Sequence, residues 1–548
     1  MSDALTRREL FQLGNALALP ALFAARDAVS AEAAAVPAGP LTPGPKIYQS
    51  IGVEPVINCR GTFTIIGGSV ELPEVRAAID AAARSFVQID ELADAVGRRL
   101  AELTGAEWGM VSAGCAAAMK HVTAACVTGG NPEKLVRIPD LSDLDKNEVV
   151  VPRSSRNSYD HAIRNVGVRM LTVETIEELE RALCSRTAMI YLLADDGPDS
   201  GPMALEAVAA VAKPRNIPIL VDAAAEVLTI PNVHLQRGAT VVAYSGGKAI
   251  CGPQCAGLLL GRKDILQSAW QASSPHHGPG RDNKVGREET LGMLAAVEMW
   301  VRRDHAAEWK TWLSWLDRIG KRLATIDGIT TAIREPTELS NKSPSLVISW
   351  DSTRFHVTGE ELAEELARTK PRIALGAGIG RSRDPRPPNQ TGVTITAWQM
   401  QPGEDKIVAD RLHSVLSRKR DPRPADMPAP AANLSGRWDV DVEFFSSRSQ
   451  HTLYIEQDGN WIQGSHKGDF SVRDMTGMIE GDQVTLRSVA RSPGDSITFI
   501  FSGKLSDAAI SGPIHLGEYL TATFTARRHV YPTTRSRILV PGGPPIAT

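Results

Sequence analysis

Three short segments in the first half of the chain carry residue types that could do chemistry together. In the first, Ser112, Gly114, Cys115 and Ala116 lie between a predicted strand and an Ala-rich predicted helix. A turn of small residues at the start of a helix exposes backbone N–H groups, which bind anions such as phosphate. No Gly-Lys-Ser or Gly-Lys-Thr follows, so this is not a Walker loop. By itself the segment is equally well explained as a tight turn.

The other two segments each end an apolar predicted strand with a charged residue. Asp222 follows Ile217–Val221, and Lys248 follows the strand that ends at Tyr244, in the sequence Ser245-Gly-Gly-Lys248. A carboxylate at the end of a buried strand costs free energy unless it meets a cation, although it could also cap the next segment. A lone lysine after a strand is usually solvated. Taken separately, neither residue indicates a site.

Together the three segments form a more specific pattern: a phosphate cradle, an acid at a strand end, and a Ser-x-x-Lys whose lysine lies 26 residues after that acid. This pattern resembles the fold-type-I pyridoxal-phosphate enzymes. The resemblance implies pyridoxal 5'-phosphate as the cofactor, with Lys248 as the Schiff-base lysine and Asp222 paired with the pyridine nitrogen. It also implies that the phosphate is held by Ser112, Gly114, Cys115, Ala116 and Ser245.

The tetrad Ser245-x-x-Lys248 has one rival interpretation, because it also opens penicillin-binding proteins and serine β-lactamases. Those proteins need Ser-Asp-Asn and Lys-Thr-Gly elsewhere, and neither tripeptide occurs in this chain. We therefore retain the pyridoxal-phosphate interpretation.

Five further segments narrow the resemblance. They are Val56–Ser69, Glu91–Gly97, Leu103–Glu107, Val221–Glu226 and Lys284–Glu289. Over about residues 46–420, the chain resembles the bacterial selenocysteine synthase group, and more closely its D-glucosaminate-6-phosphate ammonia-lyase-like members. The resemblance implies elimination next to an amino-bearing carbon, and a homodimer or larger homo-oligomer. Cys59 and Cys115 depart from it, since relatives often have small residues there.

Several residues are candidates for contact with a small-molecule amino substrate. His161 could stack on the cofactor or move a proton, and we assign it a catalytic role, although a solvated helix start explains it equally well. Arg156 and Tyr159 precede it, and Lys284 and Arg287 could bind a substrate carboxylate or phosphate or simply begin a charged helix. We predict no metal site, because Cys251-x3-Cys255 has no second ligand pair and His276-His277 lies in a Ser/Pro/Gly loop.

The elements that must position these residues are alternating strands and helices. Most predicted strands are continuous apolar runs, which implies burial on both faces of a sheet. The β-α alternation predicts a mostly parallel α/β sheet, in which ligands bind beyond the carboxyl ends of the strands. The predicted strands are Gly109–Ser112, Val149–Pro152, Val168–Val173, Ala188–Leu193, Ile217–Val221, Thr240–Tyr244 and Ala256–Leu260, with helices such as Ile176–Leu183 and Met203–Ala212 between them.

The 548 residues are enough for three or four domains. We divide them into a leader (1–40), a large cofactor-binding domain (46–330), a small α/β subdomain (331–420), a Pro-rich linker (421–432), a β-domain (433–531) and a tail (532–548). The β-domain holds 11 of the 28 aromatic residues and none of the six cysteines. Its alternating pattern, as in Trp438–Phe444, predicts an up-and-down barrel or sandwich. The segment Leu434–Trp438 resembles the start of calycin-type barrels.

The N-terminus indicates export. Arg7 and Arg8 precede an uncharged run, Leu10–Ala25, and Val29-Ser30-Ala31 is a candidate cleavage site. This arrangement resembles a twin-arginine signal, and the run is short for a spanning helix. We therefore expect a periplasmic or secreted protein without a membrane span after signal removal. The alternatives are a chance amphipathic helix or an uncleaved anchor.

Net charge −3 gives no sign of attraction to nucleic acid, and an exported enzyme would not meet aminoacyl-tRNA. The sequence therefore predicts an exported pyridoxal-phosphate lyase acting on an amino acid or amino sugar acid. An aminotransferase, a racemase, or a binding protein that has lost catalysis remain alternatives. Composition cannot show which substrate bond reacts.

Overall fold

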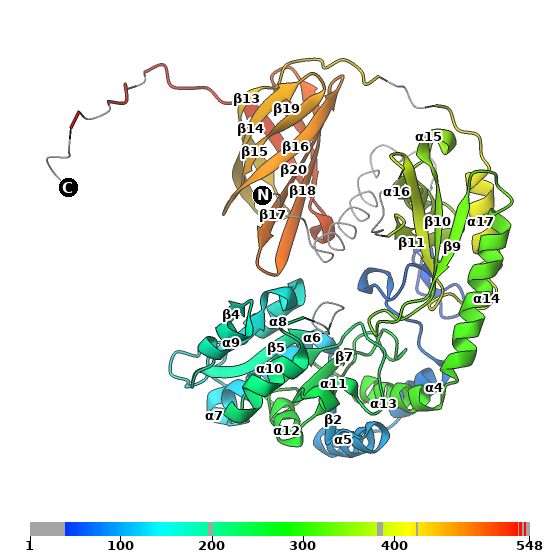
Figure 1. Ribbon diagram of the computed structural model, residues 1–548, viewed down its shortest axis with the longest axis vertical. Helices are drawn as coiled ribbons and strands as arrows, with labels where there is room; N and C mark the ends of the chain where they lie inside the picture. The colour runs from blue at the N-terminus through cyan, green and yellow to red at the C-terminus, as the bar shows by residue number, and fades with distance from the viewer. Residues whose placement is uncertain are drawn as a thin grey trace. The chain divides into compact units, whose positions relative to one another are not determined.

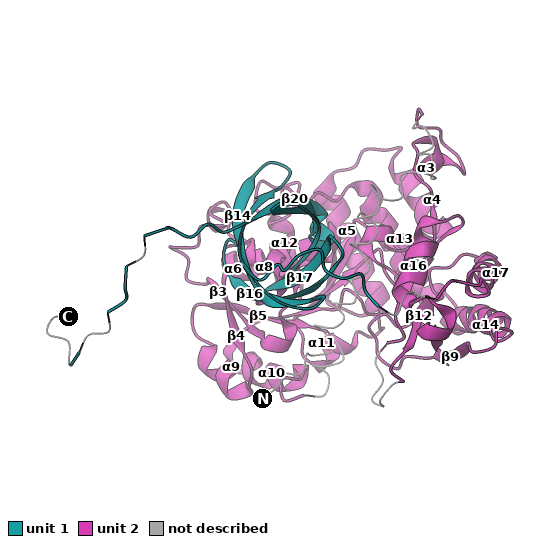
Figure 2. Ribbon diagram, turned by 90° about the horizontal axis from the view of Figure 1, so that it is seen from above, with its two compact units in different colours: residues 1–34, 423–492, 496–548 teal, residues 35–422, 493–495 magenta. Residues whose placement is uncertain are grey.

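The computed structural model of the protein describes residues 39–194, 201–380, 387–422, 426–534, 536–539 and 542–543. The predicted twin-arginine signal and its cleavage site lie outside these residues. The chain divides into two compact units, residues 35–422 with 493–495, and residues 1–34, 423–492 and 496–548 (Figure 2). The first unit contains two sheets and the second contains a closed barrel.

The larger sheet of the first unit has seven strands in the order β2-β8-β7-β6-β5-β3-β4. Its strands β2, β4, β5 and β7 are labelled in Figure 1. Strands β3 to β7 are parallel to one another. Strand β8 is antiparallel to both of its neighbours, so β2 points the same way as β7. The mostly parallel α/β class is thus confirmed. The strands are β2 (Trp108–Ser112), β3 (Glu148–Pro152), β4 (Arg169–Val173), β5 (Thr187–Leu193), β6 (Ile219–Asp222), β7 (Val241–Ser245) and β8 (Gly257–Gly261).

Helices cover both faces of this sheet, which explains the continuous apolar runs. In β3, Val150 belongs to the core of one face, whereas Val149 and Val151 belong to the core of the other, and all three are fully buried. The helices on the first face are α4 (Pro73–Ala82), α5 (Ile89–Thr104), α9 (Ile176–Ala182), α10 (Leu205–Ala212) and α13 (Arg287–Arg302). Those on the second face are α6 (Gly114–Thr128), α7 (Pro132–Leu135), α8 (His161–Arg164) and α12 (Lys263–Gln271). The short helices α3 (Ile47–Ser50) and α11 (Val233–Arg237) complete this part of the chain.

The second sheet of the same unit is the expected small α/β subdomain. Its five strands have the order β1-β11-β12-β10-β9. Strand β1 comes from residues that the sequence division places in the large domain, and it pairs in parallel with β11. The strands are β1 (Val56–Cys59), β9 (Thr330–Arg334), β10 (Ser345–Asp351), β11 (Arg372–Ala377) and β12 (Gln390–Thr396), with helices α14 (His305–Leu323), α15 (Ser352–Phe355), α16 (Gly359–Arg368) and α17 (Glu404–Leu416).

The second unit contains a closed barrel of eight strands, which settles the choice between barrel and sandwich. In β13, Trp438, Val440 and Val442 are buried inside, whereas the alternate residues Asp439 and Asp441 are exposed. This is the two-residue period of a half-buried strand. The strands are β13 (Gly436–Glu443), β14 (Arg448–Asp458), β15 (Trp461–Lys467), β16 (Val472–Glu480), β17 (Gln483–Ser492), β18 (Asp495–Ser506), β19 (Ala509–His515) and β20 (Thr521–Arg528).

Across the residues that the structure describes, no helix combines the length and the apolar character needed to cross a bilayer.

Candidate active site

The three predicted segments meet at one edge of the larger sheet. Ser112 ends β2 and Ser245 ends β7, and both are in register with Gly257, the first residue of the intervening strand β8. Asp222 ends β6 and pairs with Ala243, two residues before Ser245. Because the carboxyl ends of parallel strands lie at the same edge, the sheet brings the candidate phosphate-binding residues close to the candidate acid.

Helix α6 begins at Gly114, directly beyond this row of residues. The first N–H groups of a helix have no intrahelical acceptors, and they carry the positive end of the helix dipole. A Cβ atom on Gly257 would lie 2.5 Å from the carbonyl carbon of Gly114, so only glycine lets α6 start this close to β8. The hydroxyl of the buried Ser112 donates to the Gly114 carbonyl over 3.0 Å. Cys115 is buried and Ala116 is exposed at this helix start.

Asp222 is a buried carboxylate, with only 2% of its surface exposed. Its Oδ1 accepts hydrogen bonds from the Cys115 thiol over 3.4 Å and from the Ala224 N–H over 3.1 Å. Its Oδ2 accepts one from the Tyr191 hydroxyl over 3.0 Å. Asp222 makes no ion pair with any residue that the structure describes. A buried carboxylate held only by neutral donors is short of a cationic partner.

Two residues that hold Asp222 in place were missed by the sequence analysis. Tyr191 lies inside β5, where it is fully buried, and Asn157 is buried in the segment after β3. The side-chain amide of Asn157 donates to the Tyr191 hydroxyl over 2.8 Å, and that hydroxyl donates to Asp222. The signal for Tyr191 was a phenol within the apolar run 187–193, because a buried tyrosine needs a hydrogen-bond partner.

Burial sets the protonation of the groups around Asp222. Burial and then the charge of Asp222 raise the pKa of Cys115 and of Tyr191 well above their usual values. The thiol and the phenol therefore stay protonated at neutral pH, and both donate to the carboxylate. The charge of Lys248 acts on the Cys115 thiol in the opposite direction and lowers its pKa. Lys248 is thus close enough to Cys115 to influence the same small group of side chains.

Lys248 is half-buried in the turn that follows β7. Its ammonium group makes no hydrogen bond or ion pair with another described residue. The two glycines before it are required by packing: a Cβ atom on Gly246 would lie 2.6 Å from Met293 Sδ, and one on Gly247 would lie 2.5 Å from Gln254 Cα. The turn Ser245-Gly-Gly-Lys248 is thus held tightly at the same sheet edge as Asp222. The lysine remains available to a bound group.

The candidates after β3 have different surroundings. Arg156 is mostly buried, and its Nε donates to Asp160 Oδ2 over 2.5 Å, while its Nη1 donates to the Thr172 hydroxyl over 3.0 Å. The fully buried Asp160 thus gives the guanidinium a structural partner. Tyr159 is 63% exposed, and His161 is exposed at the first residue of α8. The substrate and catalytic roles of these residues remain predictions.

The basic segment 284–289 lies at the start of α13. Lys284 is exposed. Arg287 donates to the carbonyl of Ala82 over 3.1 Å and to that of Ala83 over 3.4 Å. These carbonyls lie at the C-terminal end of α4, where a cation is favoured by the helix dipole. Arg287 therefore has a structural partner, and a substrate role for it and for Lys284 stays a prediction.

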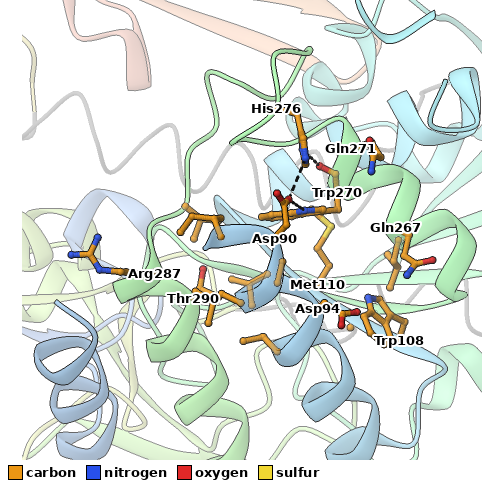
Figure 3. Close-up of a pocket in the computed structure, with 18 residues that line it drawn as sticks. Asp90, Asp94, Trp108, Met110, Gln267, Trp270, Gln271, His276, Arg287 and Thr290 are labelled. Atoms are coloured by element: carbon orange, nitrogen blue, oxygen red, sulfur yellow. Dashed lines mark hydrogen bonds and ion pairs between the residues drawn. The ribbon is translucent and has the colours of Figure 1, made fainter. Parts of the chain in front are cut away.

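Arg287 also lines a cavity of about 520 Å³ beside the edge strand β2 (Figure 3). In this cavity, Asp90 Oδ1 accepts a hydrogen bond from Trp270 Nε1 over 2.7 Å and lies 3.2 Å from His276 Nε2. Neither Asp222 nor Lys248 lines it. The residues suited to chemistry thus lie at the strand ends, apart from this cavity.

Among the described residues, no group of three or more His, Cys, Asp or Glu side chains is arranged to hold a metal ion. Cys251 is half-buried and Cys255 is exposed, and both are free thiols. His276 is occupied by Asp90 and by the carbonyls of Trp270 and Ser273.

Comparison with known proteins identifies the family. No family model matches the chain. The D-glucosaminate-6-phosphate ammonia lyase of Salmonella typhimurium (strain 14028s / SGSC 2262) is 31% identical over 301 residues, which cover 53% of this chain and 79% of that protein. This chain belongs to the D-glucosaminate-6-phosphate ammonia-lyase family. A solved structure of D-glucosaminate-6-phosphate ammonia-lyase agrees, with a TM-score of 0.60 and 26% identity, covering 68% of this chain and 98% of that one.

Two other relatives of this ammonia-lyase family member have names that denote other activities. The 5'-C-glycyluridine monooxygenase-decarboxylase of Streptomyces sp is 29% identical over 344 residues, 60% of this chain and 83% of that protein. The L-seryl-tRNA(Sec) selenium transferase of Proteus mirabilis (strain HI4320) is 23% identical over 291 residues, 46% of this chain and 58% of that protein. The expected likeness to the selenocysteine synthase group is confirmed, and the protein is a pyridoxal-phosphate enzyme.

The residues at the strand ends fit pyridoxal 5'-phosphate. Lys248 offers an amine without a partner among the described residues, which suits a covalent bond to the cofactor aldehyde. Asp222 offers a buried carboxylate without an ion pair, which suits a protonated pyridine nitrogen. The start of α6 at Gly114 offers N–H groups for a phosphate, and Ser245 lies in the adjoining row. These three chemically different needs are met at one sheet edge.

Proposed function

We propose that this family member is an exported lyase that releases ammonia from an amino acid or amino sugar acid by α,β-elimination. The observation that carries the proposal is the juxtaposition of Lys248, Asp222 and the start of α6 at one sheet edge. The 31% identity with an ammonia lyase supports elimination as the reaction type. For a 2-amino-3-hydroxy acid, loss of water across the two carbons, tautomerisation and addition of water would yield a 2-oxo acid and ammonia.

When bound, pyridoxal phosphate supplies an electron sink conjugated to the amino-bearing carbon of the substrate. The chain would supply the proton movements. Lys248 Nζ would take the proton from that carbon, because an amine freed beside the bound substrate can act as a base. Asp222 would hold a proton on the pyridine nitrogen. Tyr191 and Cys115 would orient Asp222, since both donate to its oxygens.

Substrate positioning is proposed for His161, Arg156, Lys284 and Arg287. His161 begins α8 and is exposed, which suits a group that meets a substrate from solvent. Arg156 is held by Asp160 and Thr172. To bind a substrate anion as well, its guanidinium would have to donate to that anion in addition to these partners. Lys284 is exposed and so offers an uncommitted position for an anionic substrate group, whereas Arg287 is bonded to the end of α4.

The reaction type is tested with purified full-length protein, loaded with pyridoxal phosphate and supplied with a panel of amino acids and amino sugar acids that includes D-glucosaminate 6-phosphate. Ammonia and a 2-oxo acid formed in equal amounts, without an added amino acceptor, are the expected result. A requirement for a 2-oxo acid acceptor would indicate an aminotransferase, and inversion of the substrate without ammonia would indicate a racemase. Oxygen uptake would indicate chemistry like that named for the Streptomyces relative. Lys248→Ala should abolish ammonia release.

A non-catalytic binding protein is the other class of function. Such a protein would bind its ligand equally tightly in the wild type and in the Lys248→Ala variant, and it would release no product from any member of the panel. The retained pair of Lys248 and Asp222 argues against this class.

Export and assembly are also part of the proposal. The residues Arg7 and Arg8 before an uncharged run support the twin-arginine route to the periplasm or beyond. Replacing both by lysine should retain the protein in the cytoplasm, as measured by fractionation; an unchanged distribution would contradict the route. The likeness to the selenocysteine synthase group supports a homodimer or larger homo-oligomer. Light scattering should then give at least twice the mass of the chain as purified, which is at most 58.9 kDa.

A further inference from the structure

The two ends of the barrel interior differ in chemistry. At one end, Trp438 is 1% exposed, its Nε1 donates to the Leu434 carbonyl over 2.8 Å, and the guanidinium of Arg528 lies 4.8 Å from its ring. Phe501 and Phe524 fill the middle, with ring centroids 5.1 Å apart. This end and the middle are therefore packed as an ordinary apolar core.

The other end of the interior contains a chain of buried polar side chains. The Ser488 hydroxyl lies 2.7 Å from His466 Nδ1, and His466 Nε2 lies 2.9 Å from His451 Nδ1. Burial lowers the pKa of His466 to about 3 and also lowers that of His451. Both imidazoles are thus neutral at pH 7. We assign the His451 proton to Nε2, which faces the Asp469 carboxylate, so that His466 donates to His451 and Ser488 donates to His466. His451 Nε2 is then left as a donor, 3.6 Å from Asp469.

Arg473 brings a positive charge into this polar layer. It is opposite His466 in the barrel wall, and its guanidinium carbon lies 4.7 Å from the centre of the Phe499 ring. Its Nε and Nη1 atoms are buried without a hydrogen-bond partner, and it makes no ion pair within 4.0 Å with any described residue. Burial lowers the pKa of Arg473, and the negative charge of Asp469 partly counteracts this lowering.

A guanidinium with two buried nitrogens that lack acceptors is costly, because burial removes water and the Asp469 carboxylate, whose charge raises the pKa of Arg473, makes no ion pair with it. The wall makes room for this group: a Cβ atom on Gly468 would lie 2.2 Å from Arg473 Nη2. A side chain at position 468 would therefore push the end of the Arg473 side chain aside. An anion bound here would restore the missing partner, and a carboxylate matches the fork of an arginine in two hydrogen bonds.

The rim of this same end is apolar. The turns β13–β14, β15–β16 and β19–β20 all lie at this end, because alternate turns of an up-and-down barrel lie together. They expose Phe445 (81%), Phe470 (101%) and Leu520 (43%), and Val472 at the start of β16 is 64% exposed. Exposed apolar side chains gathered around a charged interior indicate a ligand with both kinds of surface.

We propose that this end of the barrel binds a small amphipathic carboxylate, with its carboxylate on Arg473 and its hydrocarbon part against the rim formed by Phe445, Phe470, Val472 and Leu520. The short Ser488–His466 distance resembles a nucleophile and its base. However, a histidine whose pKa is about 3 is a weak base at neutral pH. We therefore assign the Ser488–His466–His451 chain to ligand binding, with its N–H groups as donors, and propose no catalytic step at this end of the barrel.

The test uses full-length protein saturated with pyridoxal phosphate, so that the cofactor site does not take up the probe. Octanoate and 4-phenylbutanoate are titrated calorimetrically, with octan-1-ol and 4-phenylbutan-1-ol as uncharged probes of the same shape. Both carboxylates should bind, and each alcohol should bind at least about tenfold more weakly. Absence of carboxylate binding, or alcohols that bind equally well, would overturn the proposal.

Substitutions locate the site. Arg473→Gln should weaken octanoate binding about tenfold or more, whereas Arg527→Gln, which changes an exposed arginine of β20 that is paired with Asp441, should leave it unchanged. Gly468→Ala gives a second variant, since it displaces the guanidinium without removing it. Phe470→Ser should weaken octanoate binding about threefold. Phe86→Ser is the control and should have no effect, because Phe86 lies in the other unit, where it is 94% exposed. Equal affinities in Arg473→Gln and Arg527→Gln would overturn the assignment, and circular dichroism verifies that each variant is folded.

Discussion

The hydroxyl of Tyr191 donates to Oδ2 of Asp222 over 3.0 Å, from the neighbouring parallel strand. Asn157 in turn donates to the Tyr191 oxygen over 2.8 Å, so the orientation of the carboxylate depends on a chain of three buried groups. Hydrogen bonds to a charged group are stronger than those between neutral groups, and more so in a water-poor site. The acid that would hold the cofactor nitrogen is thus fixed before the cofactor binds.

Removing this hydroxyl should impair the reaction without removing the cofactor. We expect Tyr191→Phe to lower kcat about 10- to 100-fold, because a hydrogen bond to a charged group contributes about 1.5–3 kcal/mol. The absorbance band of the bound cofactor should also titrate at a different pH. Tyr244→Phe is the matched control, since Tyr244 is equally buried but bonds to Asn232. Equal losses in both variants would show only a general effect of disturbing the core.

Substitution of Lys248 tests the covalent attachment. Wild-type protein loaded with pyridoxal phosphate should show a visible absorbance band that borohydride bleaches, because the reagent reduces a carbon–nitrogen double bond. Lys248→Ala should lose the borohydride-fixed cofactor, as measured by the mass of the intact chain. Lys263→Ala serves as control, because Lys263 lies over the Trp108 ring at the start of α12. A reduced adduct that persists in Lys248→Ala would contradict the assignment.

Asp222→Asn should separate binding from turnover. The amide keeps the size of the side chain and can still accept the hydrogen bond from Tyr191. It has no negative charge to hold a proton on the cofactor nitrogen, so we expect kcat to fall at least about 100-fold while the cofactor remains attached. The readouts are the borohydride-fixed mass and single-turnover kinetics. Near wild-type turnover would reduce Asp222 to a structural role.

The sequence was sufficient to predict the sheet edge and its charged residues. Asp222 and Lys248 are recognisable because the two residues and the small-residue turn 112–116 together form a pattern that resembles fold-type-I pyridoxal-phosphate enzymes, although neither residue indicates a site by itself. The bounds of β5 and β7 differ from the predicted strands by a single residue at one or both ends. Strands that are buried on both faces can be predicted closely, because burial on both faces leaves no polar positions to interrupt their apolar runs.

The rest depended on pairings that connect distant parts of the chain. The pairing of Cys59 with Leu375, which places β1 in the small sheet, joins residues more than 300 positions apart and leaves no local pattern. The partners of Arg287 are the carbonyls at the end of α4, and a sequence shows only the charge of the arginine, not these acceptors. Tyr191 and Asn157 were missed for the same reason: their function lies in their contacts.

A buried histidine should make the stability of the first unit depend on pH. His121 on α6 is fully buried, and neither ring nitrogen has a hydrogen-bond partner among the described residues. Burial lowers its pKa from 6.5 to about 4. Between these two values the unfolded chain takes up a proton that the folded chain does not, so the free energy of unfolding should fall as pH drops below 6.5. The slope from one such group is at most about 1.4 kcal/mol per pH unit.

Urea unfolding at several pH values between 7.5 and 5 measures this effect. His121→Gln should flatten the dependence on pH, whereas His277→Gln, at an exposed position, should leave it unchanged. Other buried histidines also contribute to the pH dependence of the unfolding free energy. The test therefore compares the pH dependence of His121→Gln with that of His277→Gln. Parallel curves for wild type and His121→Gln would contradict the assigned cause.

The last prediction concerns the independence of the two units. The cofactor residues Asp222 and Lys248 lie in the continuous part of the first unit, residues 35–422, and the barrel has its own apolar interior around Trp438 and Phe501. Truncation after Arg420 should therefore leave a folded protein that still binds pyridoxal phosphate, because Arg420 keeps its bonds to Val415 and Glu365.

Limited proteolysis gives the complementary measurement. The segment from Asp421 to Pro430 contains Pro-rich sequence that cannot sustain a helix or a sheet. Cleavage there should release two stable fragments, and the fragment containing residues 433–531 should melt cooperatively with a β-type circular dichroism spectrum. There is a physical reason why the result could be otherwise: a barrel could also cover an apolar surface that the first unit needs for solubility. Loss of cofactor on truncation, or a segment that resists protease in the folded protein, would show that the barrel belongs to the catalytic unit.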